Sequence, residues 1–266
     1  MRVGLAQLEC FVGDIERNCV KIKHFCRLAA DGGCEVIVFP EITDTGYVPE
    51  VIAAKASSWD GLPFQTARRC ASELKLIVIC GLSERVDDRI FNSQAIISME
   101  GSLLGRYRKT HLFTPDPICE ERIFSPGADL TLLGIQNLTW GFSICYDLRF
   151  PELYRLLALR GAEVLVNSTA WPLSREKHWD ILTRARAIEN QAFFLGVNRV
   201  GSDNEFRFCG RSRIIDPFGE VVAEASADRE ELLVGEIEVE KIRRFRKKLP
   251  VFSGRRADIY GNLGKT

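Results

Sequence analysis

The amino-acid sequence predicts an α/β fold, in which buried strands are interleaved with amphipathic helices. Residues 36–39 form a continuous apolar run, Val-Ile-Val-Phe, which is bounded by turn residues as in a strand buried on both faces. Between residues 15 and 29, apolar residues recur at spacings of four and three, which is typical of a helix with one buried face. A second helix and strand follow, and then an expected hairpin that turns at Glu100-Gly101. This succession of strand, helix, strand and strand pair indicates the α/β class.

The other elements follow from the same two periodicities and from turn residues. Asp14 is expected to cap the first helix and Gly32 to end it, and Pro151 is expected to open a later helix that Gly161 closes. We find no internal repeat, low-complexity segment or linker, so we expect a single domain over residues 1–266. The other expected helices span 63–75 and 175–192, and the expected strands span 3–8, 35–40, 76–81, 92–99, 102–108, 130–135, 139–144, 163–170 and 193–200, followed by a meander of strands at 211–215, 221–225 and 232–239.

The composition excludes several classes of partner and site. The chain has 36 Lys and Arg against 36 Asp and Glu, so no net field draws it to nucleic acid or to an anionic membrane, and a small molecule is the expected partner. The nine cysteines include no C-x-x-C pair, which predicts neither a disulfide framework nor a zinc site and is typical of a reducing cytoplasm. The N-terminal apolar stretch is too short for a signal-peptide core, and no run approaches the roughly 18 apolar residues of a membrane span. We therefore expect a cytoplasmic protein without membrane contact.

The segment at 141–152 suggests a catalytic nucleophile. An apolar strand ends there at Cys145, and a proline-led helix begins at Pro151. Such a turn exposes a side chain at the end of a sheet, near unpaired helix N–H groups that favour a thiolate. The alternative interpretation is that Cys145 is a small buried apolar residue, which is the usual state of a free cysteine.

Two further residues place a charged group where its desolvation would cost free energy unless it has a partner or a function. Glu41 directly follows the predicted strand at 35–40, although a surface loop position is the alternative. Lys109 begins a long irregular stretch that reaches Pro126-Gly127, and such stretches are often functional. His111 in this stretch is predicted to be a hydrogen-bonded structural residue rather than a general base. A thiolate, a carboxylate and an ammonium could divide acyl transfer between them.

Other catalytic motifs are missing from the sequence. It contains no G-x-G-x-x-G, P-loop or H-E-x-x-H pattern, and Gly141-x-Ser143-x-Cys145 lacks the second glycine of a serine-hydrolase elbow. The basic run at 241–248 follows an acidic stretch at 228–240, which favours a solvated helix or an interface over a nucleic-acid patch.

Three separated motifs carry a resemblance to a known family. These are Phe39-Pro40-Glu41 with Thr45-Gly46-Tyr47, then Tyr107-Arg108-Lys109-Thr110-His111-Leu112-Phe113, then Ile144-Cys145-Tyr146-Asp147-Leu148-Arg149-Phe150-Pro151-Glu152. In this order they resemble the nitrilase superfamily of carbon–nitrogen hydrolases, and the ω-amidase-like branch within it. The resemblance implies a four-layer α-β-β-α sandwich that pairs into a homodimer, with no metal and no organic cofactor. Residues 241–266 would form a C-terminal tail that contributes to the dimer interface.

The resemblance also implies roles for individual residues. Glu41 would be the general base and acid, Lys109 the oxyanion stabiliser and Cys145 the nucleophile. Glu120 would position the substrate amide, with Glu121 as the alternative. Tyr47 and Trp171 would contact the substrate in the pocket, and the backbone N–H of Tyr146 would be the second donor to the oxyanion.

The predicted function is hydrolysis of a small linear amide to a carboxylic acid and ammonia, through a thioester intermediate. The leading hypothesis for the substrate is an ω-amide of a 2-oxo dicarboxylic acid. The alternatives are an N-carbamoyl amine, a deaminated peptide amide, or a binding or scaffold homologue without turnover. Arg149 could bind a substrate carboxylate or could anchor Asp147 or Glu152.

Overall fold

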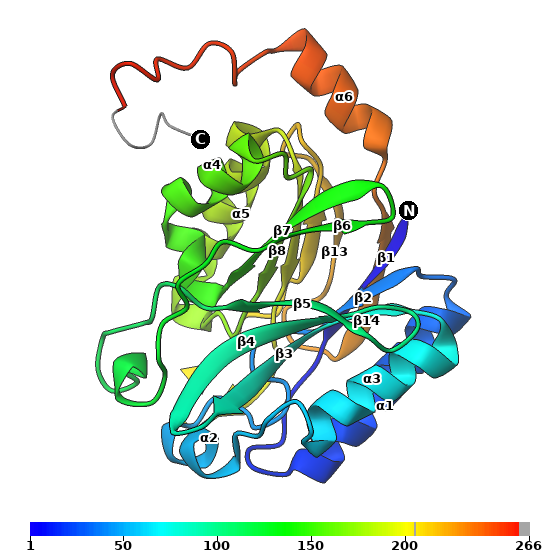
Figure 1. Ribbon diagram of the computed structural model, residues 1–266, viewed down its shortest axis with the longest axis vertical. Helices are drawn as coiled ribbons and strands as arrows, with labels where there is room; N and C mark the ends of the chain where they lie inside the picture. The colour runs from blue at the N-terminus through cyan, green and yellow to red at the C-terminus, as the bar shows by residue number, and fades with distance from the viewer. Residues whose placement is uncertain (205, 261–266) are drawn as a thin grey trace.

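The computed structural model describes residues 1–204 and 206–260, which form two six-stranded sheets packed face to face (Figure 1). The first sheet has the order β14 (Glu231–Glu236), β1 (Arg2–Gln7), β2 (Val36–Val38), β3 (Ile77–Val86), β4 (Arg89–Ile97) and β5 (Leu103–Arg108). The second has the order β13 (Val221–Glu224), β12 (Arg213–Ile215), β9 (Phe193–Val197), β8 (Val164–Ser168), β7 (Leu138–Ile144) and β6 (Leu132–Ile135).

Helices cover the outer face of each sheet. Helices α1 (Ile15–Asp31) and α3 (Leu62–Leu74) pack on the first sheet, and α4 (Pro151–Leu159) and α5 (Glu176–Asn190) pack on the second. The predicted four-layer α-β-β-α sandwich is therefore confirmed. The remaining elements are α2 (Pro49–Lys55), α6 (Val239–Lys248), the 3₁₀ helices η1 (Glu120–Arg122), η2 (Cys145–Arg149) and η3 (Leu173–Arg175), and the short pair β10 (Ser202–Asp203) and β11 (Phe206–Arg207).

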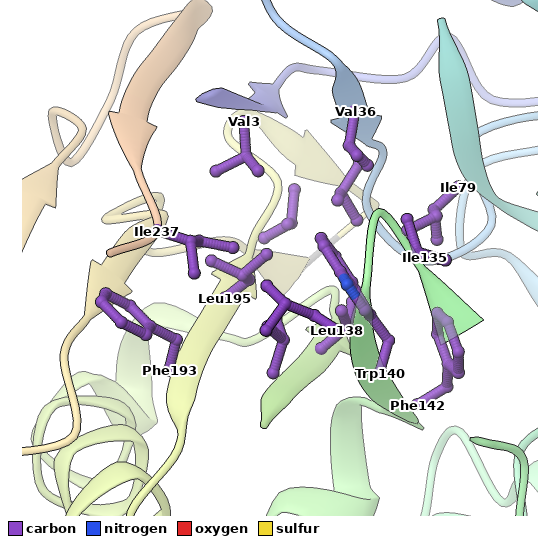
Figure 2. Packing of buried hydrophobic residues seen from close by; sticks show 14 of the residues in the cluster. Val3, Val36, Ile79, Ile135, Leu138, Trp140, Phe142, Phe193, Leu195 and Ile237 are labelled. Atoms are coloured by element: carbon purple, nitrogen blue, oxygen red, sulfur yellow. The ribbon is translucent and has the colours of Figure 1, made fainter. Parts of the chain in front are cut away.

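The central core lies between the two sheets. Figure 2 shows Val3, Val36 and Ile79 of the first sheet facing Trp140 and Leu195 of the second. Burial on both faces explains the continuous apolar run of β2. Val36 and Val38 pack in this central core, while Ile37 packs against the helices. A strand that is covered on both faces has no polar side to alternate with.

The predicted meander at the end of the chain is wrong in its last strand. Strands β12 and β13 form an antiparallel pair in the second sheet, whereas β14 crosses to the first sheet and pairs antiparallel with β1. Leu233 packs toward the central core and Val234 toward the helices, so β14 is covered on both sides. The edge of β1 would otherwise leave its backbone groups without partners, and a nearest-neighbour meander could not supply them.

The predicted helix ends are confirmed, but one helix was not predicted. The Asp14 carboxylate accepts a hydrogen bond from Arg17 N at 3.1 Å and caps α1. Gly32 and Gly33 end that helix, and Gly33 has a φ of 70°, in the left-handed region that glycine adopts readily. Helix α2 has Pro49 in its first turn, but it buries only Ile52, so no apolar period marks it in the sequence.

The sheet topology brings several strand ends to one edge of the sandwich. Strand β5 is antiparallel to β4 and β4 to β3, so β2, β3 and β5 run in the same direction. Strands β7 and β8 are parallel to each other in the opposite sheet. The residues that follow β2, β5, β7 and β8 meet at this edge, as the contacts below establish. In the part of the chain described, no helix combines the length and the apolar character needed to cross a membrane.

Candidate active site

Glu41 lies fully buried just beyond the end of β2. Its Oε1 accepts hydrogen bonds from Asn92 Nδ2 at 2.7 Å and from Lys109 Nζ at 2.9 Å, and its Oε2 accepts one from Ala170 N at 2.8 Å. The close passage of this segment requires Gly81, since a Cβ there would lie 2.1 Å from the Pro40 carbonyl oxygen. The carboxylate is therefore held from three directions, by both sheets.

Lys109 lies between two carboxylates at the end of β5. Its Nζ donates to Glu41 Oε1 at 2.9 Å and to Glu120 Oε1 at 2.8 Å, and the side chain has no solvent contact. Burial lowers the pKa of Lys109, but the charges of Glu120 and Glu41 outweigh it and hold the pKa well above its usual range. The ammonium therefore stays charged inside the protein.

Glu120 belongs to η1 in the long irregular stretch, and it is the glutamate that reaches the site. The Tyr47 hydroxyl donates to its Oε1, and Phe113 N donates to its Oε2 at 2.6 Å. Burial raises the pKa of Glu120, while the charge of Lys109 opposes this rise. Glu121, the alternative, is exposed to solvent.

Cys145 follows β7 on a strained turn at the pocket floor. Its φ is 44°, in the left-handed region that residues with a Cβ seldom adopt. The expectation that helix N–H groups favour a thiolate here is not met, because η2 is a short 3₁₀ turn and burial raises the pKa of the Cys145 thiol. The charge of Glu41 adds to this rise and Lys109 opposes it. Burial and the Glu41 charge therefore favour the thiol over the thiolate.

Asp147 connects the turn of Cys145 to the segment that follows Lys109. Its Oδ2 accepts from Ile144 N at 2.9 Å and from the Tyr107 hydroxyl at 2.7 Å, and its Oδ1 accepts from His111 N at 3.0 Å. His111 Nδ1 also lies 2.7 Å from Asp147 Oδ1, and its ring stacks on Phe150 with the centroids 3.7 Å apart. The predicted structural role of His111 is confirmed.

A pocket opens above Cys145 and is lined mainly by aromatic side chains. Tyr47, Tyr146 and Trp171, to which the resemblance assigned pocket or oxyanion contacts, all line it, and Trp171 Nε1 donates to the Arg175 carbonyl at 2.8 Å. The other lining residues are Phe113, Ile118, Arg149, Ala170, Pro172, Arg175, Phe206 and Phe208. The pocket walls are therefore apolar, with positive charge from two arginines.

Arg149 does not anchor an acidic neighbour, which corrects one of its two predicted roles. It forms no ion pair with Asp147 or Glu152 in the described part of the chain. Its guanidinium instead lies 4.8 Å from the Trp171 ring centroid, and its Nη1 lies 3.2 Å from His178 Nδ1. The guanidinium thus faces the pocket and remains available to a ligand.

The sequence did not reveal all of the residues at this site. Asn92, which donates to Glu41, lies in β4 beside Ser93 and Gln94, and all three are buried. A run of three polar residues inside an apolar strand was a usable signal, because buried polar groups need partners. No pattern pointed to the backbone N–H of Ala170 or to Arg175.

The geometry places the Cys145 thiol in the pocket lining, near the buried Glu41 carboxylate and Lys109 ammonium whose charges act on its pKa. Acyl transfer through a covalent intermediate requires a nucleophile, a proton acceptor and a fixed positive charge, and these three types of group are chemically suited to those roles. Among the described residues, His, Cys, Asp and Glu side chains form no group of three or more suited to hold a metal ion.

The chain is similar to known proteins over nearly its whole length. The family described as Carbon-nitrogen hydrolase matches residues 2–247. The chain is 34% identical over 268 residues to 2-oxoglutaramate amidase from Bacillus subtilis, covering 97% of this chain and 98% of the relative. It is 30% identical over 268 residues to omega-amidase NIT2 from Homo sapiens, covering 97% and 96%.

A solved structure adds a similarity at the level of the fold. It is a mutant of the amidase from Nesterenkonia sp. AN1, with covalent addition of the acetamide moiety of fluoroacetamide at the active site cysteine. The TM-score is 0.86 at 25% identity, and the alignment covers 97% of this chain and 95% of that one. With its fold, its family match and its amidase relatives, the chain belongs to the carbon–nitrogen hydrolases, in the ω-amidase-like branch of the nitrilase superfamily, and is an amidohydrolase of non-peptide C–N bonds.

Proposed function

We propose that the protein hydrolyses a small linear amide to a carboxylic acid and ammonia, through a thioester on Cys145. The observation that carries this proposal is the buried contact of Lys109 Nζ with Glu41 Oε1 and Glu120 Oε1, at 2.9 and 2.8 Å, beside the floor of the Cys145 pocket. Burying these charges is costly unless they are paired and have a purpose. A binding or scaffold homologue would not need them.

In the first half of the reaction, Glu41 takes the proton of the Cys145 thiol while the sulfur attacks the amide carbonyl. A base is needed because burial and the Glu41 charge keep the pKa of this thiol high. The oxyanion of the tetrahedral intermediate is stabilised by the Lys109 ammonium and the Tyr146 backbone N–H. The C–N bond then breaks, Glu41 returns its proton to the leaving nitrogen, and ammonia departs.

In the second half, Glu41 activates a water molecule that attacks the thioester carbonyl. The C–S bond breaks, the proton returns to Cys145, and the carboxylic acid leaves. Glu120 keeps Lys109 in place through its 2.8 Å contact and positions the substrate amide. Its own position depends on the Tyr47 hydroxyl and on Phe113 N.

We propose an ω-amide of a 2-oxo dicarboxylic acid as the substrate class. The two relatives named for such substrates, at 34% and 30% identity, support this choice, and so does Arg149 in the pocket wall. A guanidinium over Trp171 is suited to a carboxylate at the end of the substrate far from its amide.

The reaction is tested by ammonia release from 2-oxoglutaramate, 2-oxosuccinamate, an N-carbamoyl amine and a simple nitrile. We expect turnover of the two ω-amides, and no release of ammonia by Cys145→Ala. Turnover of the carbamoyl amine alone would contradict the proposed substrate class but would leave the proposed role of Cys145 as nucleophile intact. If no amide reacts and a thiol-reactive acyl probe does not label Cys145, the scaffold alternative holds instead.

We also propose that two subunits pair through a face that includes α5 and the C-terminal tail. Ile181 and Ile188 are exposed on α5, at 64% and 46%, and Leu249 and Ile259 are exposed in the tail, at 51% and 65%. The tail continues from α6 past α4, where Arg155 lies 5.5 Å from the Phe252 ring centroid (Figure 1). The end of the predicted tail, 261–266, lies outside the described residues.

Sedimentation equilibrium tests this assembly. We expect a dimer for the wild type and a monomer for Ile181→Asp, because a charge would have to be buried at the interface. Val20→Asp on α1 is the control, since Val20 is equally exposed, at 63%, on the opposite side of the sandwich. A monomeric wild type at micromolar concentration would exclude the pairing.

We further propose a cytoplasmic location, where the nine free cysteines would stay reduced.

A further inference from the structure

A second arginine shares the pocket with Arg149. Arg175 ends η3 directly before α5, and it lines the same pocket as Cys145. Its guanidinium lies 5.1 Å from the Phe113 ring centroid, as that of Arg149 lies 4.8 Å from Trp171. Each cation therefore rests on an aromatic ring of the pocket wall.

Neither of these arginines has an acidic partner among the described residues, 1–204 and 206–260. Three other shielded arginines are paired with acidic residues, since Arg108 binds Glu84 at 2.7 Å, Arg199 binds Asp203 at 2.5 Å and Arg213 binds Asp180 at 2.7 Å. Arg246, which has no acidic partner among the described residues, donates instead to the Gln191 and Ala162 carbonyls. Burial lowers the pKa of Arg149, and the positive charge of Arg175 lowers it further. Among residues 1–204 and 206–260, no acidic side chain thus pairs with either of these two neighbouring cations to offset their repulsion.

We propose that Arg175 acts with Arg149 as an anion subsite, which makes Arg175 a specificity-determining residue that selects amides with a carboxylate at their far end. This inference rests on the proposed function, because it assigns the distal end of the same substrate. Two guanidinium groups can donate hydrogen bonds to both oxygens of one carboxylate. The surrounding rings shield the two half-buried guanidinium groups partly from water, and such shielding strengthens these bonds.

The subsite selects by charge rather than by length alone. A neutral amide of equal length would fill the apolar walls but would leave both guanidinium groups without a partner. The penalty for such unpaired polar groups is what gives a site strong discrimination. Neutral amides are therefore expected to be poor substrates even where their shape fits.

The test compares succinamate, which carries a carboxylate, with butanamide, which has the same carbon chain without it. In the wild type we expect a higher kcat/KM for succinamate. Arg175→Gln should lower the ratio of the two kcat/KM values by about 10-fold or more, and Arg175→Lys should recover part of it. Lys177→Gln removes an exposed charge of α5 outside the pocket and should leave the ratio unchanged. An unchanged ratio in Arg175→Gln would overturn the proposal.

A binding measurement separates this inference from the proposed reaction. Succinamate and butanamide are titrated by calorimetry into Cys145→Ala, with and without Arg175→Gln. We expect succinamate to bind more tightly than butanamide, and about 10-fold more weakly once Arg175 is replaced. If the wild type hydrolyses neither amide while this binding pattern holds, the reaction is wrong and the subsite stands. Equal binding of the two amides to Cys145→Ala would contradict the subsite, whatever the turnover.

Discussion

Two regions of the site contain buried or half-buried charges, but only one of them pairs these charges internally. We call the group of Glu41, Lys109, Glu120 and Cys145 the floor, and the pocket wall with Arg149 and Arg175 the mouth. At the floor, the Lys109 ammonium forms ion pairs with Glu41 and Glu120 at 2.9 and 2.8 Å. At the mouth, Arg149 and Arg175 rest on aromatic rings and have no acidic partner among the described residues. The charges of the floor have partners of opposite charge without a ligand, whereas those of the mouth would gain such a partner from a bound anion.

This difference separates the chemistry of the site from its selectivity. Charges that are fixed by one another do not reorganise during a reaction, which is what transition-state stabilisation requires. Charges without partners gain the most electrostatic stabilisation when a ligand of opposite charge binds. Changes at the floor should therefore affect kcat, and changes at the mouth should affect the discrimination between substrates.

Removal of the nucleophile should have the largest effect. In Cys145→Ala no thioester can form, so we expect kcat to fall by at least about 10⁴-fold with little change in thermal stability. Ammonia release and a thermal melt measure the two quantities. Residual turnover above about 1% of the wild type would show that another group is the nucleophile.

Glu41→Gln should lower kcat by about 10²–10⁴-fold, because the proton of the thiol then has no acceptor. The same change should lower the pKa of the Cys145 thiol, since it removes a nearby negative charge. The pKa is measured by thiolate absorbance against pH, with Cys145→Ala subtracted to remove the other cysteines. The proposed base role fails if the Gln variant keeps full activity.

Lys109→Met should lower kcat by about 10²-fold through the loss of oxyanion stabilisation. It should also destabilise the fold by about 3–5 kcal/mol, because Glu41 and Glu120 remain buried beside each other. Urea denaturation measures the free energy of unfolding. Adding Glu120→Gln to Lys109→Met should restore part of this stability but none of the activity, and a double variant as unstable as the single one would argue against the repulsion.

Arg149→Gln at the mouth should have the smallest effect on turnover. We expect KM for succinamate to rise about 10-fold while kcat changes less, because the guanidinium contacts the far end of the substrate. Steady-state kinetics on succinamate and butanamide separates the two constants. A kcat that falls as steeply as in Lys109→Met would mean that the mouth takes part in the chemistry.

The sequence alone determined the fold class, most of the elements and three residues of the floor. Periodicity and caps located α1 and β2, because burial on one face or on two faces leaves a local pattern. Glu41, Lys109 and Cys145 each stand at or just beyond the end of a strand, and the three motifs around them identified the family before any contact was known.

Only the tertiary structure decided how these segments meet. The pairing of β14 with β1 joins residues more than 200 positions apart, and no local pattern encodes such a contact. Asn92, the N–H of Ala170 and Arg175 come from separate elements, and their roles arise only when two sheets bring their ends to one edge. The pKa of Cys145 was also decided there, because burial and a neighbouring carboxylate act through space and not along the chain.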